Sequence, residues 1–365
     1  MNVQDCIIKA IEGDSPDHVP IFIPGFDSRF RENFDAASKK RDDGKACIVN
    51  GQDITPLVSL GVDLCEVQGP PHVKEDFDLP KLEASDLRVD MYGRVFKRGI
   101  SGNMQYFMYQ GPYLRTEEQL ARWDHVIPRE IEAGWQERVY KETIEAVDKH
   151  AICPVFKACD GLYSILEEAI GVVNMAMLLH DNPEAIDTHL ERIYRVVASD
   201  VNALLEARIA FICINDDITV GNRPSITPDL VFKHLRPLYK QLVDKIHAAG
   251  GKAFFRTTGD VLNVTDTIVA AGFDAIHITN PDPAYLEEFL VTWGDKACAV
   301  GNFDVMSMLS HGTPVQVQKR AREIVSNCER NFPRYIFGTN DVLPGSTKLE
   351  NVRAMIIAVR QHGKL

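Results

Sequence analysis

The sequence lacks the short motifs that identify several large enzyme classes. It contains no G-x-S-x-G segment, no G-x-x-x-x-G-K-[S/T] segment, and no G-x-G-x-x-G segment after a strand pattern. These absences disfavour an α/β-hydrolase, a P-loop nucleotide hydrolase and a Rossmann dinucleotide-binding fold, respectively. The histidines form no H-x-H or H-E-x-x-H pattern, which disfavours a zinc site built mainly from histidine.

Positive charge and long apolar runs are also scarce. The chain has 40 Lys and Arg against 52 Asp and Glu, a net charge of −12. Nucleic acids and anionic membranes attract basic patches, so neither partner is expected. No window approaches the roughly 18 apolar residues of a membrane span. The chain starts without a basic, apolar leader, and its eight cysteines contain no C-x-x-C pair. A cytoplasmic protein with buried thiols is therefore expected.

Short strand-like runs alternate with helical patterns along the chain. The runs cover residues 19–23, 62–67, 152–156, 210–214, 253–255, 274–278, 297–300 and 335–337. Several are almost continuously apolar, as strands covered on both faces are, and parallel order requires helical crossovers. Helix starts are visible at Asn182-Pro183, Thr227-Pro228 and Thr313-Pro314. The pattern predicts an α/β fold, a single (β/α)8 TIM barrel over residues 1–365, with an open doubly wound sheet as the alternative.

The first crossovers depart from this regular alternation. Residues 90–96 and 102–108 are two strand-like segments with glycine turns. We predict an N-terminal extension and a β-hairpin insertion near residues 88–110 that folds over one mouth of the barrel.

Polar residues follow almost every predicted strand, at the end where barrel enzymes build their active sites. They include Phe26-Asp27-Ser28-Arg29, Glu66, Gln68, Asp160, Tyr163, Asp216, Asp217, Arg256, Thr258, Asp260, Asn280, Asp282, Asn302, Asp304, Asn340 and Asp341, with Glu167 one turn into a helix. Carboxylates crowded into one mouth raise each other's pKa or bind a cation, which suits acid catalysis or a metal.

For three sets of polar residues, the sequence allows either a structural or a functional role. Asp282 and Asp304 are either helix caps or site residues. Asp216 and Asp217 favour function, because two adjacent carboxylates exceed what one cap needs. Arg256 emerges from an apolar strand and requires an anionic partner, which is either a substrate carboxylate or a neighbouring aspartate.

A set of short segments, in this order and spacing, resembles the uroporphyrinogen decarboxylase superfamily, best over residues 210–355. The superfamily includes the cobalamin-dependent methyltransferases of methanogens and acetogens. The segments are Asp216-Asp217, Ser225-Ile226-Thr227-Pro228, Ile246-His247-Ala248-Ala249-Gly250, Gly259, Ala271-Gly272-Phe273-Asp274-Ala275, Asn280-Pro281, Gly301-Asn302-Phe303-Asp304 and Glu350-Asn351-Val352. The resemblance implies one barrel and offers two activities, methyl transfer and decarboxylation.

The thiol-methylating branch of this superfamily carries a zinc site whose positions correspond here to Arg256, Thr258 and Asp341. Arginine and threonine are poor zinc ligands, so that arrangement is not expected. Residues 24–31 retain arginines but not the Arg-Gln-Ala-Gly-Arg pattern of the decarboxylases, which makes porphyrinogen decarboxylation the alternative.

The resemblance therefore leads to the hypothesis of a corrinoid-dependent methyltransferase. It would move a methyl group from a small methylated donor, with a methoxylated aromatic ether as the leading candidate, to the Co(I) corrinoid of a separate protein. Glu167, Asp216 or Asp217 would supply a proton to the leaving oxygen. Alternatively, Glu167 and Asp217 would hold a zinc ion in a different ligand set.

The remaining candidates are substrate-binding residues: Phe26, Arg29, Tyr163, Arg256, Asn302 and Asn340. A non-enzymatic binding protein on a degenerate barrel is a further alternative, and a homodimer stays open.

Overall fold

The computed structural model describes residues 2–38, 46–73, 78–101, 104–158, 161–220, 223–224 and 231–363. Eight parallel strands close into a barrel, and the closure pairs β1 with both β4 and β15. The strands are β1 (Ile21–Phe22), β4 (Leu64–Val67), β8 (Cys153–Lys157), β9 (Phe211–Asn215), β12 (Lys252–Arg256), β13 (Ala275–Ile278), β14 (Cys298–Gly301) and β15 (Tyr335–Gly338). Each overlaps one of the runs predicted from the sequence, so the predicted barrel is confirmed.

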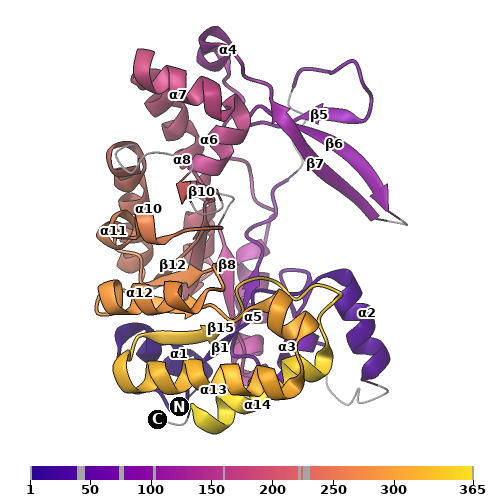
Figure 1. The fold of residues 1–365 in the computed structure, drawn as a ribbon. Helices are drawn as coiled ribbons and strands as arrows, with labels where there is room; N and C mark the ends of the chain where they lie inside the picture. The colour runs from indigo at the N-terminus through magenta and orange to yellow at the C-terminus, as the bar shows by residue number, and fades with distance from the viewer. Residues whose placement is uncertain are drawn as a thin grey trace.

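Helices surround the barrel and connect its strands (Figure 1). They are α1 (Val3–Glu12), α2 (Ser28–Ala37), α3 (Thr55–Leu60), α4 (Glu117–Arg122), α5 (Trp135–His150), α6 (Tyr163–Ile170), α7 (Val172–Asp181), α8 (Pro183–Glu206), α10 (Arg236–Ala248), α11 (Leu262–Ala271), α12 (Pro283–Trp293), α13 (Pro314–Asn331) and α14 (Leu349–His362). Two π-helical segments, η1 (Val231–Leu235) and η2 (Val305–His311), precede α10 and α13.

The predicted helix starts follow from capping side chains. Asn182 caps α8, and Thr313 forms the predicted capping box with Gln316 at the start of α13. Asp282 and Asp304 also cap the helices that follow them. The predicted start at Thr227-Pro228, together with the segment Ser225 to Pro228, lies outside the described residues.

The N-terminal extension closes the amino end of the barrel. Ile7 and Ile11 of α1 pack against apolar side chains that point into the barrel, among them Leu64, Cys213 and Phe254. Side chains two residues apart on a strand point to the same face. The residues that point inward at the other, carboxyl, end of the barrel are therefore polar: Glu66, Lys157, Asn215 and Arg256.

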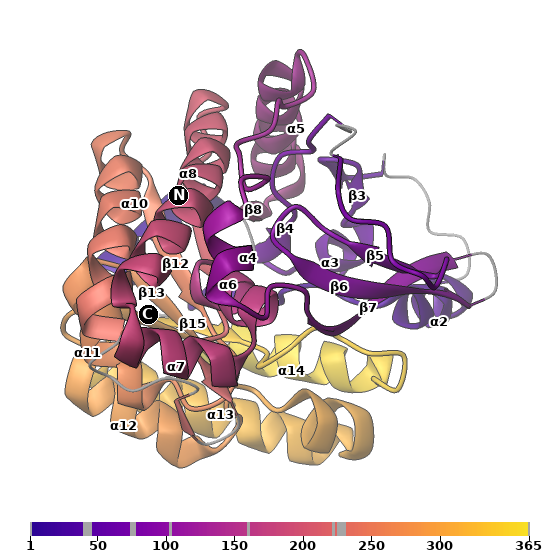
Figure 2. The ribbon, with the colours of Figure 1, turned by 90° about the horizontal axis from the view of Figure 1, so that it is seen from above.

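The insertion forms a three-stranded antiparallel sheet of β5 (Leu87–Val89), β6 (Arg94–Ser101) and β7 (Met104–Pro112). The predicted hairpin is present as β6 and β7, but the strand predicted over residues 90–96 was wrong in its first half. Asp90 accepts backbone hydrogen bonds from Tyr92 and Arg94 and so makes a turn there. The sheet contacts α6 and extends to one side of the barrel (Figures 1 and 2).

Three further features complete the described chain. Two small two-stranded sheets pair β2 (Ile48–Val49) with β3 (Gln52–Asp53) and β10 (Thr219–Val220) with β11 (Arg223–Pro224). Seven of the eight cysteines fall within the described residues, where all seven are buried and free. No described helix is both long enough and apolar enough to cross a membrane.

Candidate active site

Asp216 lies directly after β9 and is fully buried. Its two carboxylate oxygens accept hydrogen bonds from the backbone N–H groups of Leu162, Tyr163 and Ser164 at 2.7 to 2.9 Å. The hydroxyl groups of Ser164 and Tyr239 donate two more, at 2.7 and 2.6 Å. Burial raises the pKa of Asp216, and these hydrogen bonds oppose the rise. The carboxylate thus holds the first turn of α6 against the barrel.

The glycine before α6 belongs to the same arrangement. Gly161 has a φ of +94°, and a Cβ there would lie 2.3 Å from the Asp216 carboxyl carbon. Only glycine fits this close approach without strain. Asp160, which was a candidate in the same loop, lies outside the described residues.

Glu167 and Asp217 lie close to this anchor at the barrel mouth. Glu167 is half-buried on α6, and burial is the main cause that raises its pKa; the charges of Glu168, Asp216 and Asp217 act in the same direction. A hydrogen bond with Tyr163 opposes the rise. Asp217 is also half-buried and accepts a hydrogen bond from the Thr258 N–H at 2.9 Å. The predicted carboxylates are therefore brought together.

Arg256, at the end of β12, finds its anionic partners within the protein. Its Nη1 lies 3.0 Å from Glu66 Oε2, and its Nη2 lies 3.2 Å from Asp341 Oδ1. Arg256 is largely buried, whereas the Asp341 side chain is 62% exposed. Arg256 therefore pairs with neighbouring carboxylates, one of the two alternatives considered for it, and two such carboxylates are present.

This arrangement does not fit a zinc ion at the three superfamily positions. A guanidinium stands at the first, an exposed threonine at the second, and Asp341 at the third is already paired with Arg256. Guanidinium cannot ligate zinc, and a single carboxylate does not make a site. Within the described ranges, no group of three or more His, Cys, Asp or Glu side chains is placed to hold a metal. A zinc ion held by Glu167 and Asp217 stays a prediction.

The other predicted substrate-binding residues are spread over the mouth. Phe26 lines a cavity of about 420 Å³ together with Glu66, Lys157 and Arg256. Arg29 is exposed on α2 and does not line this cavity. Tyr163 is buried beside Glu167.

Two further predicted binding residues, Asn302 and Asn340, make hydrogen bonds that hold loops together, and their role in binding stays a prediction. The Asn302 side-chain amide donates to the carbonyl oxygens of Asn280 and Asp282, both at 2.8 Å. Asn340 accepts from the Val305 N–H at 2.9 Å and donates to the Thr279 carbonyl at 3.2 Å. These contacts join the loops after β13, β14 and β15.

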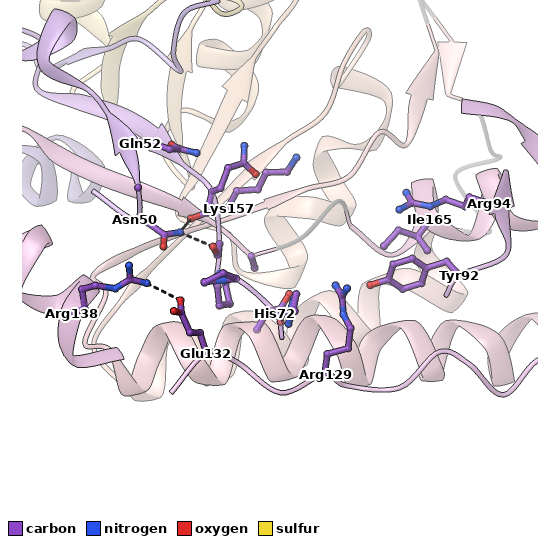
Figure 3. A pocket seen from close by; sticks show the side chains of 17 residues that line it. Asn50, Gln52, His72, Tyr92, Arg94, Arg129, Glu132, Arg138, Lys157 and Ile165 are labelled. Atoms are coloured by element: carbon purple, nitrogen blue, oxygen red, sulfur yellow. Dashed lines mark hydrogen bonds and ion pairs between the residues drawn. The ribbon is translucent and has the colours of Figure 1, made fainter. Parts of the chain in front are cut away.

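A larger cavity of about 660 Å³ opens beside the mouth (Figure 3). It shares the lining residues Gln52, Gln68 and Lys157 with the 420 Å³ cavity, so the two adjoin. Figure 3 shows Arg129, Tyr92 and Arg94 on one side and Arg138 with Glu132 on the other. The remaining charged or titratable lining residues are His72 and Asp200.

Most of the lining of the larger cavity was not predicted from the sequence. Lys157 is the last residue of β8 and follows the rule that polar side chains at strand ends form the site. Asp200 falls on the apolar stripe of α8, three residues after Val197, where a carboxylate is out of pattern. His72 and Arg129 lie on irregular segments, and no local pattern marks them.

The fold and the position of the charged side chains define the class of protein. The protein is a parallel eight-stranded barrel with charged side chains gathered at the carboxyl ends of its strands, where barrel enzymes carry out their chemistry.

The family model for uroporphyrinogen decarboxylase (URO-D) matches residues 104–362, which is more than half of the chain. The protein belongs to the uroporphyrinogen decarboxylase family, and the resemblance seen in the sequence is confirmed.

One solved structure shares the fold over its full length. A methyltransferase from Methanosarcina mazei aligns over 99% of this chain and 99% of its own, with a TM-score of 0.67 and 15% sequence identity. A class V chitininase from Pseudomonas fluorescens Pf-5 aligns over 92% of this chain and 98% of its own, with a TM-score of 0.43 and 8% identity. No curated protein matches the sequence significantly.

Proposed function

We propose that the protein is a methyltransferase that moves a methyl group from a small methylated donor to the Co(I) corrinoid of a separate protein. A methoxylated aromatic ether is the proposed donor, which makes the reaction an O-demethylation. Two facts support the proposal: membership of the uroporphyrinogen decarboxylase family, and a fold shared over the full length with a Methanosarcina methyltransferase.

The observation that carries the proposal is the raised pKa of Glu167. An ether oxygen is a poor leaving group unless it receives a proton or meets a Lewis acid. Burial and three neighbouring carboxylates raise the pKa of Glu167, so this carboxyl group retains its proton more readily than an exposed glutamate does. Glu167 lies on α6 beside Tyr163 and close enough to Asp217, which follows β9, for the two charges to interact.

The roles of the protein's own side chains follow from this geometry. The donor is held with its ether oxygen toward Glu167. As the carbon–oxygen bond breaks, the electron pair stays on oxygen, which takes the Glu167 proton and leaves Glu167 as a carboxylate. When docked, the partner's corrinoid would supply Co(I) as the nucleophile and methyl acceptor. Asp216 acts indirectly, because it fixes the helix turn that carries Tyr163. No role is assigned to zinc at Arg256, Thr258 and Asp341, because those three side chains do not fit that ion.

The proposal is tested by mixing the purified protein with a Co(I) corrinoid protein and a panel of methyl ethers, methyl thiols and methylamines. We expect the absorption spectrum of methylcobalt with an ether donor. Glu167→Gln should lower the rate by about 10² to 10⁴, the contribution typical of general acid catalysis. Glu191→Gln, at a half-exposed helical position paired with Arg195, is the matched control and should leave the rate unchanged.

The same preparation separates the alternatives. Methylcobalt formation from none of the donors would reject the proposal. Release of carbon dioxide from a porphyrinogen without any corrinoid would instead establish a decarboxylase. A protein that only binds its ligand would show neither reaction, and Glu167→Gln would leave its binding intact.

A further inference from the structure

The lining of the 660 Å³ cavity carries an excess of positive charge. Four cationic side chains, Arg94, Arg129, Arg138 and Lys157, face two carboxylates, Glu132 and Asp200. The whole chain, in contrast, has a net charge of −12. We propose that this cavity is a binding site for a small organic acid, whose oxyanion is held by Arg129 and His72.

A short backbone pairing brings these two residues into one wall. His72 and Ile131 form an antiparallel bridge between the segment after β4 and the segment before α5. The Val73 N–H donates to the Glu130 carbonyl at 2.8 Å, and the Glu132 N–H donates to the Pro71 carbonyl at 3.3 Å. The positions of His72 and Arg129 are therefore fixed by main-chain contacts.

Two of the other cations are already neutralised. Arg94 lies 2.8 Å from both Asp90 Oδ2 and Glu168 Oε2. Arg138 lies 3.1 Å from Glu132 Oε2 on the exposed rim of the cavity. Neither is the obvious partner of a ligand.

Arg129 and His72 differ from them because each has a buried nitrogen atom without a partner. Arg129 Nε is buried and makes no hydrogen bond, and the carboxylate on which the Arg129 charge acts is Asp200. His72 Nε2 lies 3.3 Å from Asp200 Oδ1, while His72 Nδ1 is buried and unpaired. Buried polar groups are normally paired, so each one left without a partner needs an explanation, and at a cavity wall a bound ligand supplies one.

An organic acid fits both the charge and the shape of the site. A carboxylate accepts hydrogen bonds at two oxygens and pairs strongly with guanidinium. A cavity of this volume is within the range of small-molecule sites, roughly 300 to 1,000 Å³. Tyr92 and Ile165 also line it and offer apolar contact to the rest of the acid. The inference goes beyond the proposed methyl transfer, because Glu167 does not line this cavity and the site stands whether or not the acid is the methyl donor.

The test measures binding without any corrinoid protein, by titration calorimetry on the full chain at low ionic strength. Benzoate is the probe, and benzamide is its uncharged match in shape. We expect benzoate to bind at least about tenfold more tightly than benzamide. Arg129→Gln should weaken benzoate binding at least about tenfold. Arg122→Gln, an exposed arginine of the neighbouring helix, is the control and should change nothing.

Several results decide the inference. If the wild-type protein binds no benzoate, binds benzamide equally well, or binds benzoate unchanged in Arg129→Gln, the site is rejected. Arg129→Lys and His72→Gln provide the same test should Arg129→Gln not fold, as judged by circular dichroism. Phosphate and sulfate are titrated in parallel, and Arg129-dependent binding of these ions alone would reject an organic acid. Benzoate binding without methyl transfer would leave this site standing and reject only the proposed function.

Discussion

Two regions at the same end of the barrel differ in how far their buried polar atoms are hydrogen-bonded. Around Asp216, five donors saturate one buried carboxylate. In the neighbouring cavity, Arg129 Nε and His72 Nδ1 are buried without any partner. Both oxygens of the Asp216 carboxylate are thus occupied by donors from within the protein, whereas two nitrogen atoms of the second region have no partner among the described residues. Saturation thus distinguishes a structural anchor from a binding wall where residue type alone does not.

The sequence pattern favoured a functional role for the region around Asp216 over the neighbouring cavity. The adjacent carboxylates Asp216 and Asp217 favoured chemistry because of their number, and the cavity residues were hardly marked. A catalytic role for Asp216 and Asp217 stays a prediction. The hydrogen bonds around Asp216 favour a positioning role for this residue, and Glu167 is the better acid.

The largest expected effect is on stability, in Asp216→Ala. The substitution leaves the N–H groups of α6 and the Tyr239 hydroxyl buried without their acceptor, and it should lower the free energy of unfolding by roughly 3 to 5 kcal/mol. Urea unfolding followed by circular dichroism measures the loss. Asp217→Ala, which removes the acceptor of one N–H, should cost no more than about 1.5 kcal/mol. Equal losses in the two variants would contradict the comparison.

The next effect concerns how methyl transfer depends on pH. Because burial and neighbouring carboxylates raise the pKa of Glu167, its protonated, active form should persist above the usual glutamate range. The rate should be highest at low pH and fall as pH rises through this raised pKa. Glu167→Gln should lower the rate about 100-fold or more and remove this limb of the profile. A wild-type rate that rises over the same pH range would instead indicate a base.

Asp200→Asn tests the cavity side of the comparison with a smaller effect. Burial raises the pKa of Asp200, and His72 and Arg129 oppose the rise. The folded state therefore binds this proton more tightly than the unfolded chain does. The stability that the group contributes is present below its unfolded pKa and is lost as pH rises through its folded pKa. Relative to wild type, the asparagine variant should gain stability over that rise. Urea unfolding at a series of pH values checks the sign, and a constant difference would contradict it.

The smallest effect is expected at the rim, in Asp341→Asn. The Asp341 side chain is 62% exposed, and Arg256 keeps its buried partner Glu66. The free energy of unfolding should change by no more than about 1 kcal/mol, as for other exposed ion pairs. Glu66→Gln at the buried end of the same network should cost more. A larger loss from Asp341→Asn would show that the rim residue, not Glu66, holds Arg256 in place.

Much of the fold was predictable because its signals are local. Apolar runs such as residues 210–214, the cap at Asn182 and the capping box at Thr313 depend on a few neighbouring residues, and all correspond to described elements. The inserted sheet was less predictable, since a turn at Asp90 is decided by side-chain hydrogen bonds to the backbone. Contacts between residues far apart in the sequence were not predictable, because the order of the strands in the barrel decides them.

The sequence by itself therefore determined the barrel, the family and the end of the barrel at which the polar residues collect. It also argued against the thiol-type zinc set, because the side chains of Arg256 and Thr258 are poor zinc ligands. Only the tertiary structure decided which polar atoms are saturated. Asp216 obtains its donors from residues more than 50 positions earlier in the chain and from Tyr239, and His72 pairs with Ile131, two residues after Arg129. Partners of this kind are set by packing, which no local pattern records.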